Sequence, residues 1–105
     1  MASFFLRLNA PRSTFTLDMN EAERQLMQQH AIYWHGALAR GKIVVFGMVA
    51  DPNGAFGVGV GQFDNEAEAR SFADNDPTIR AGVGFSVDVF PMPMGAVHPA
   101  FAASS

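Results

Sequence analysis

The sequence predicts an α+β fold in which two helices cover one face of an antiparallel β-sheet. Two segments carry apolar residues at helical spacing, and four shorter segments are apolar with alternation or with β-branched residues. Along the chain they follow the order strand, helix, strand, strand, helix, strand. With 105 residues and no low-complexity linker, the chain has the length of one domain with one core.

The first strand is expected at residues 3–9, because side chains there alternate between two faces. Leu6 and Leu8 share one face, and Arg7 lies on the other. Residues 10–18, "APRSTFTLD", have no such period and predict a loop.

The first helix is expected to begin near residues 19–20 and to run to Arg40. Asp18 and Glu21 have the spacing of a capping box, and Gly41 stands where a left-handed C-cap is favoured. The predicted buried stripe recurs at spacings of four and three residues and consists of Met27, Ala31, Trp34 and Leu38.

A β-hairpin is expected next. Residues 42–50 are an apolar run rich in β-branched side chains, which predicts a strand buried on both faces. Residues 51–54, "DPNG", indicate a turn, because proline presets φ and Asn-Gly tolerates positive φ. The returning strand, residues 55–63, has one face made of Gly57, Gly59 and Gly61. Such a face indicates close approach to the backbone by a packed helix, the commoner case, or by a bound ligand.

The second helix is expected over residues 65–75, with Asp64 as its N-cap. It ends before Pro77, because proline disfavours helical geometry in the residue that precedes it. A loop at residues 77–84 leads to a last alternating strand at residues 85–91. The complete order is the βαββαβ of a ferredoxin-like unit.

The other face of this sheet has no cover within one chain, although residues 42–50 are apolar on that face too. A second subunit packed face to face is the simplest cover, so we expect a homodimer and leave a higher oligomer open. Residues 1–91 form the predicted domain, and residues 92–105 form a tail that is either disordered or an arm across the partner. The arm is favoured, because water would otherwise surround Met92, Met94, Val97 and Phe101.

Composition argues against several function classes. The net charge is −3 and the 7 Lys and Arg residues are scattered, so nucleic acid is not an expected partner. The absence of cysteine excludes disulfides and thiolate chemistry. No apolar segment approaches the roughly 20 residues that span a bilayer, so we expect a soluble cytoplasmic protein without a membrane partner.

Motif spacing argues against a bound nucleotide or metal. The G-x-G-x-x-G template fails in the glycine-rich strand, since its last position is Gln62 or Asp64. His30 and His35 diverge by roughly 140° on a helix, which disfavours a shared metal ion. No cofactor is therefore expected.

General acid–base catalysis is the chemistry that these arguments leave open. It needs a histidine or carboxylate in a pocket that excludes water. His30 and His35 lie on either side of the apolar stripe, roughly 60° and 70° from it. The helical wheel does not choose between them. The ordinary alternative for either is a histidine on the helix surface with a satisfied hydrogen bond.

Four short motifs occur together in one known family. They are H-x-x-Y-W at residues 30–34, G-K at 41–42, D-P-x-G at 51–54 and D-P-x-x-x-A-G at 76–82. Over roughly residues 3–91 the chain resembles the YciI-like (YCII-related) family of small dimeric α+β barrel proteins. The combination is fairly specific, whereas any one motif alone is weak.

This resemblance implies a catalytic pair of one histidine and one aspartate near the helix–sheet junction, which by motif are His30 and Asp51. Asp51 would orient the imidazole and stabilise its charged form, while His30 moves a proton. The further candidates for contact with the substrate are Arg7, Trp34, Asp76 and Ser86. The ordinary alternatives are that Arg7 is an exposed arginine on a strand and that Trp34 is a core residue.

By the same resemblance we expect a lyase or isomerase acting on a small cyclic oxygenated metabolite. The family includes a dehydrochlorinase of chloroaromatic breakdown, and muconolactone isomerases are similar in fold, so lactones, muconates and chlorinated quinols are candidate substrates. Two alternatives are open. One is a non-catalytic dimer that binds a small molecule or another protein, and the other is a cofactor-free monooxygenase.

Overall fold

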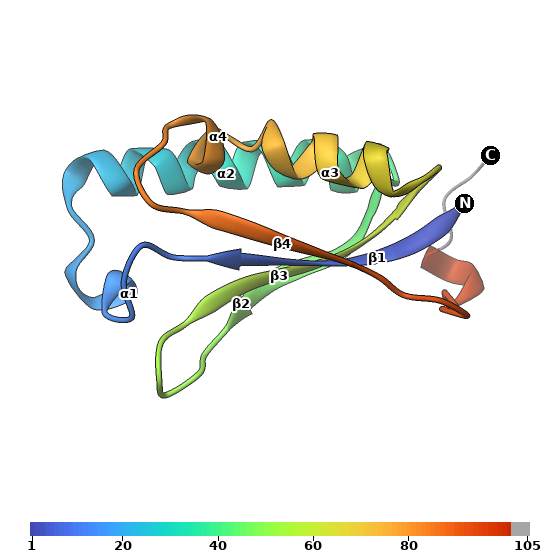
Figure 1. The fold of residues 1–105 in the computed structure, drawn as a ribbon, viewed down its shortest axis with the longest axis horizontal. Helices are drawn as coiled ribbons and strands as arrows, with labels where there is room; N and C mark the ends of the chain where they lie inside the picture. Colours follow the sequence, from blue (N-terminus) through green and yellow to red (C-terminus); the bar gives the residue numbers. More distant parts are fainter. Residues whose placement is uncertain (102–105) are drawn as a thin grey trace.

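The computed structural model describes residues 1–101 and contains the predicted strands and long helices in the predicted order (Figure 1). Its four strands are antiparallel and lie in the order β2-β3-β1-β4. Both long helices cover the same face of the sheet (Figure 1). The predicted α+β, ferredoxin-like fold is thereby confirmed. The elements are β1 (Ala2–Asn9), α2 (Glu21–Ala39), β2 (Ile43–Val49), β3 (Phe56–Phe63), α3 (Glu66–Asp74) and β4 (Ser86–Pro91).

Short helices lie in segments for which the sequence pattern predicts no regular structure. These are α1 (Phe15–Asp18) after the first strand, α4 (Pro77–Arg80) after α3, and the 3-10 turn η1 (Pro99–Phe101) in the tail. Each has only three or four residues, about one turn, and one turn is too short to repeat an apolar period.

The N-caps of both long helices differ from the predicted ones. At α2 the side chain of Asn20 accepts from the Glu23 N–H, and the Glu23 carboxylate accepts from the Asn20 N–H, which makes this pair the capping box. The predicted cap Asp18 lies in α1 instead. At α3 the cap is Asn65 rather than Asp64, because the Asn65 side chain accepts a helix N–H.

The core lies between the helices and the sheet. On α2 the buried stripe is rotated from the predicted one, since Leu38 is 38% exposed whereas Ala37 is fully buried. This rotation turns His30 inward and leaves His35 exposed. The buried apolar residues of the cluster are Phe4, Leu6, Trp34, Ala37, Ile43, Phe63, Ala69, Ala73 and Val89.

The glycine face of β3 points toward the helices. A Cβ on Gly59 would lie within 2.8 Å of Trp34 Cη2 and closer still to Cζ3. A Cβ on Gly61 would lie 2.9 Å from Ile43 Cδ1. Both distances are below ordinary van der Waals contact, so any side chain here would displace the core. A packed helix is thus the reason for glycine at position 59, whereas at Gly61 the space is taken by side chains of neighbouring strand residues.

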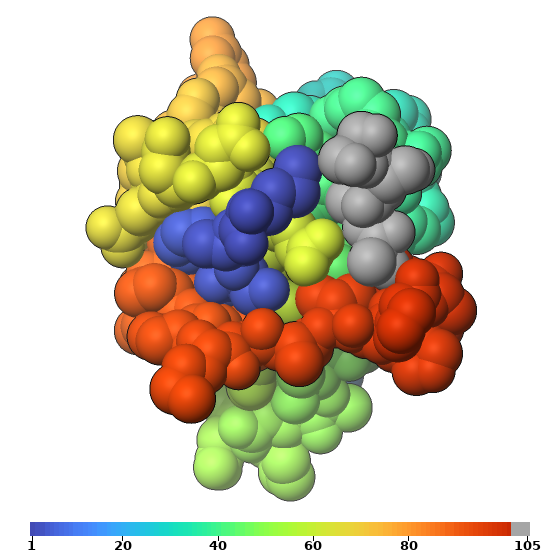
Figure 2. Space-filling model, turned by 90° about the vertical axis from the view of Figure 1, so that its right-hand side faces the viewer, coloured from blue at the N-terminus to red at the C-terminus, as the bar shows by residue number. Residues whose placement is uncertain are grey.

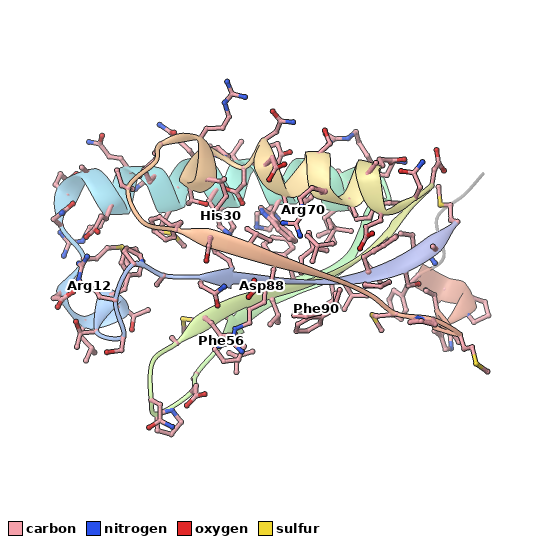
Figure 3. All side chains as sticks on the ribbon, viewed as in Figure 1. Arg12, His30, Phe56, Arg70, Asp88 and Phe90 are labelled. Carbon is pink, nitrogen blue, oxygen red and sulfur yellow. The ribbon has the colours of Figure 1, made fainter. Side chains whose placement is uncertain are left out.

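The opposite face of the sheet carries exposed apolar side chains. Val45 on β2 is 57% exposed and Phe90 on β4 is 51% exposed, and Figure 3 shows Phe56 and Phe90 on the side away from the helices. Within one chain, β2 is thus buried on the helix side only, and not on both faces as predicted.

The tail turns back on the start of β1. The Met92 N–H donates to the Ser3 carbonyl at 2.9 Å, and Figure 2 shows the tail crossing the end of the molecule beside the first residues. The predicted tail, residues 92–105, extends past the described part of the chain, which ends at Phe101. Within that described part, no helix combines the length and the hydropathy needed to cross a bilayer.

Candidate active site

A histidine–aspartate pair joins α2 to the start of α4. His30 Nδ1 lies 2.7 Å from Asp76 Oδ2. His30 projects from the inner face of α2 toward the sheet (Figure 3), and its side chain is 13% exposed. Asp76 is the N-cap of α4, where Pro77 takes a position in the first turn that needs no N–H. The packing of α4 on α2 brings the two residues together.

The Asp76 carboxylate is fully buried and is surrounded by donors. Its Oδ2 also accepts from Trp34 Nε1 at 2.6 Å, and its Oδ1 accepts from the N–H and the hydroxyl of Thr78 at 2.9 and 2.7 Å. Burial alone would raise the pKa of Asp76. The hydrogen bond and charge of His30, together with the bonds from Trp34 and Thr78, outweigh burial and lower this pKa below its usual value. Asp76 is therefore an ionised acceptor at neutral pH.

An ionised Asp76 decides which nitrogen of His30 carries the proton in the neutral ring. Because a carboxylate only accepts, Nδ1 must donate, and Nε2 is then left with its lone pair. Within residues 1–101, Nε2 makes no hydrogen bond, and no buried side-chain nitrogen or oxygen there lacks a partner. Nε2 is consequently accessible. The arrangement prepares one ring nitrogen to take a proton.

His30 lies on the wall of a pocket of about 280 Å³ between α2, the sheet and the segment that contains α1. The strands contribute Leu6, Leu8 and Phe46, and α2 contributes Met27 and Trp34. Most of the side chains that line the pocket around His30 are therefore apolar. Further apolar side chains on its walls are Phe15, Met19, Met48 and Phe85.

The α1 wall of the pocket is held by Arg12. Both terminal nitrogens of Arg12 donate to the Glu23 carboxylate at 2.7 Å, and its Nε donates to Asp18 Oδ1 at 2.7 Å. The bonds from Arg12 and from the Asn20 N–H lower the pKa of Glu23 to about 2. This wall could not be predicted from sequence, because it depends on a one-turn helix and on an ion pair between separate segments.

The model of one protein family matches most of the chain. The YCII-related domain matches residues 3–93, which include the four strands except the first residue of β1, both long helices and every residue of the His30 site. This chain belongs to the YCII-related domain family. A search of curated proteins found no match.

In this YCII-related domain the carboxylate partner of His30 is Asp76, which corrects the expected pairing with Asp51. Asp51 lies in the β2–β3 turn, where its Oδ1 accepts from the Asn53 N–H at 2.8 Å. Asp76 in turn is buried beside His30 and does not line the pocket, so it has no surface for a substrate. No local signal distinguishes the two aspartates, because each precedes a proline and each accepts from the backbone N–H two residues further on.

Arg7 and Ser86 lie on the sheet face away from the pocket. The Arg7 guanidinium carbon is 3.9 Å from the centre of the Phe56 ring, and its Nε donates to Asn9 Oδ1 at 2.9 Å. The amide of Asn9 donates to Ser86 Oγ at 3.2 Å and to Asp88 Oδ2 at 2.8 Å. In the YCII-related domain these residues form a polar network across β1 and β4, separate from His30.

Trp34 serves both the core and the pocket. Its ring packs against Gly59 and lines the pocket, and its N–H holds Asp76. As for metals, no group of three or more His, Asp or Glu side chains within residues 1–101 of this YCII-related domain could hold an ion.

Proposed function

We propose that this YCII-related protein is an acid–base enzyme of the lyase or isomerase type, in which His30 transfers a proton on a small cyclic carbonyl compound. The observation that carries the proposal is the 2.7 Å bond between His30 Nδ1 and the buried Asp76, in a histidine that lines an apolar pocket and whose other ring nitrogen makes no hydrogen bond within residues 1–101. A structural histidine needs no accessible nitrogen. A general base does.

In the proposed step, neutral His30 Nε2 takes a proton from a carbon next to the substrate carbonyl. The electron pair of the broken C–H bond moves onto the carbonyl oxygen and forms an enolate. In an isomerase the imidazolium returns the proton at another carbon. In a lyase the enolate re-forms the carbonyl, a C=C bond forms as the neighbouring C–Cl bond breaks, chloride leaves with the electron pair of that bond, and His30 gives its proton to water. The ionised Asp76 stabilises the imidazolium that exists between the two steps, because it already accepts the Nδ1 proton.

We further propose that the protein is a homodimer that pairs the uncovered sheet faces. Exposed Val45 and Phe90 support this, because they lie on a face that no element of the described chain covers. Arg7 and Asp88 are cross-strand neighbours on the same face, so a two-fold axis there would bring opposite charges together. Residues 1–91 would be the domain, with residues 92–105 as an arm on the partner.

The test of the acid–base role is hydrogen exchange. Wild-type protein is incubated in D2O with lactones, chlorinated quinols and muconate derivatives, and proton NMR follows both deuterium uptake and product formation. We expect His30→Gln to lose about 100-fold or more in rate, the usual contribution of a general base. The matched control is His35→Gln, which changes the exposed histidine of the same helix and should stay within about twofold of wild type.

Equal rates in wild type and His30→Gln would refute the role of His30. Absence of exchange and turnover with every compound would favour the non-catalytic binding protein instead. Asp76→Asn should lower the rate less than His30→Gln, because Asp76 orients the base and does not touch the substrate.

A further inference from the structure

We propose that the ligand of the His30 pocket is an uncharged, mainly apolar molecule of about one substituted six-membered ring, with a single oxygen directed at His30. This inference rests on the proposed function for the identity of the site. It goes further in excluding carboxylate ligands, which include the muconates among the candidate substrates. Two independent features carry it: the size of the pocket and the chemistry of its walls.

The volume suits one ring. A cavity of about 150 Å³ is enough to hold benzene, so about 280 Å³ leaves room for a ring with one or two small substituents. Bicyclic or long-chain ligands would have to extend through the open side. Gly59 does not enlarge this space, because Trp34 occupies the position over it, whereas Gly57 is part of the pocket wall.

The walls offer a ligand little besides apolar contact. Among the described residues that line the pocket, the only charged or titratable side chain is His30, and the hydroxyl of Thr16 is the other polar group free to bind. The Trp34 N–H is already taken by Asp76. A carboxylate moved from water into such a place loses its hydration without compensation.

The nearest arginines are committed elsewhere. Arg12 holds the α1 wall from outside, with its nitrogens bonded to Glu23 and Asp18. Arg7 lies over Phe56 on the sheet face away from the helices. Neither guanidinium lines the pocket. Among the side chains that line the pocket, only protonated His30 could therefore pair with a ligand carboxylate.

That pairing would defeat the proposed chemistry. If His30 binds a carboxylate as imidazolium, Nε2 already carries a proton and cannot accept another from the substrate. Binding of an anion and action as a base thus exclude one another at this site. A neutral ligand with a hydroxyl group can instead donate a hydrogen bond to Nε2, which stays unprotonated and available as a base.

The chain carries its own reporter, since Trp34 is its single tryptophan and lines the pocket. Fluorescence titration at pH 7 compares 4-methylphenol with 4-hydroxybenzoate, which share a ring and a phenol and differ in a methyl group against a carboxylate. We expect 4-methylphenol to bind with a Kd at least about tenfold lower. Equal or tighter binding of 4-hydroxybenzoate, or failure of 4-methylphenol to bind at millimolar concentration, would overturn the inference.

A positive charge added to the pocket provides a second test of the preference for uncharged ligands. Met48→Arg places a cation on the exposed rim of the pocket and should reverse or abolish the preference for the neutral ring. The matched control is Met94→Arg, which adds the same charge at a fully exposed position outside the pocket and should leave the preference unchanged. An unchanged preference in Met48→Arg would argue that charge does not decide binding, against the inference.

The proposed function and the proposed ligand class can be refuted independently of each other. If 4-methylphenol binds and no compound of the exchange panel is turned over, the ligand class stands and the acid–base function falls. If exchange depends on His30 but anions bind as well as neutral rings, the function stands and the ligand class falls.

Discussion

His30 Nδ1 and Asp76 Oδ2 lie 2.7 Å apart, and the same Asp76 oxygen accepts the Trp34 N–H. The candidate catalytic histidine and a core tryptophan therefore share one buried acceptor. The site and the core of this protein are parts of one hydrogen-bonded structure, so substitutions at the site should change both activity and stability. The predictions below separate the two effects.

Asp76→Asn should destabilise the protein by about 1–3 kcal/mol, the range for a buried group left without a partner. Whichever way the new amide turns, its NH2 group faces an N–H donor, of Thr78 on one side or of Trp34 on the other. Urea unfolding gives the free energy. The control is Asp51→Asn, which keeps the acceptor for Asn53 in a surface turn and should change stability by less than about 0.5 kcal/mol. Equal losses in the two variants would contradict the assignment of Asp76.

Gly59→Ala should destabilise the protein by about 1–3 kcal/mol, as overpacking does in other cores. The added methyl group would collide with the Trp34 ring, which cannot move without breaking its bond to Asp76. The control is Gly47→Ala on the neighbouring strand, where a Cβ meets nothing within 4 Å. If thermal unfolding showed the two variants to be equally stable, the close packing of α2 on β3 would be wrong.

Glu23 should contribute to stability in a pH-dependent way. Its pKa is about 2 in the folded protein against an ordinary value of 4.5 for a glutamate, so folding favours the ionised form. That contribution is complete above about pH 4.5 and is lost as the pH falls toward 2. Urea unfolding at pH 6, 4, 3 and 2 should therefore show wild type and Glu23→Gln converging in free energy as the pH falls.

The control for that experiment is Glu21→Gln, which removes an exposed carboxylate from the same helical turn without touching Arg12. A loss of stability in Glu21→Gln as large as in Glu23→Gln would assign the effect to helix charge rather than to the ion pair with Arg12.

Phe90→Glu should convert the proposed homodimer to a monomer. It places a charge on the edge strand β4 of the uncovered sheet face, where a partner sheet would have to desolvate it. Sedimentation equilibrium should give the mass of two chains for wild type and of one chain for the variant. Ile32→Glu is the control, because Ile32 is 73% exposed on α2 and lies away from the sheet. A wild-type protein that sediments as a monomer would refute the dimer.

Local sequence predicted the elements well, since strand alternation and helical period are properties of neighbouring residues. The glycine face of β3 even indicated a closely packed helix, and Gly59 beneath Trp34 confirms it. The N-caps of the two long helices lie one or two positions after the predicted ones. Asn20 and Asn65 compete with adjacent aspartates of similar capping strength, and ion pairs such as that of Asp18 with Arg12 decide the outcome.

The choice of His30 over His35 followed from a motif in the sequence, because the wheel alone could not make it. Its partner was decided only by the tertiary structure. Asp51 and Asp76 both precede a proline, and no period in the chain relates either of them to residue 30. The packing of α4 against α2 brings Asp76 within 2.7 Å, and the folding of the D-P-x-G turn on itself occupies Asp51. Short-range patterns determine elements, whereas a buried hydrogen bond between distant segments exists only after those elements have packed.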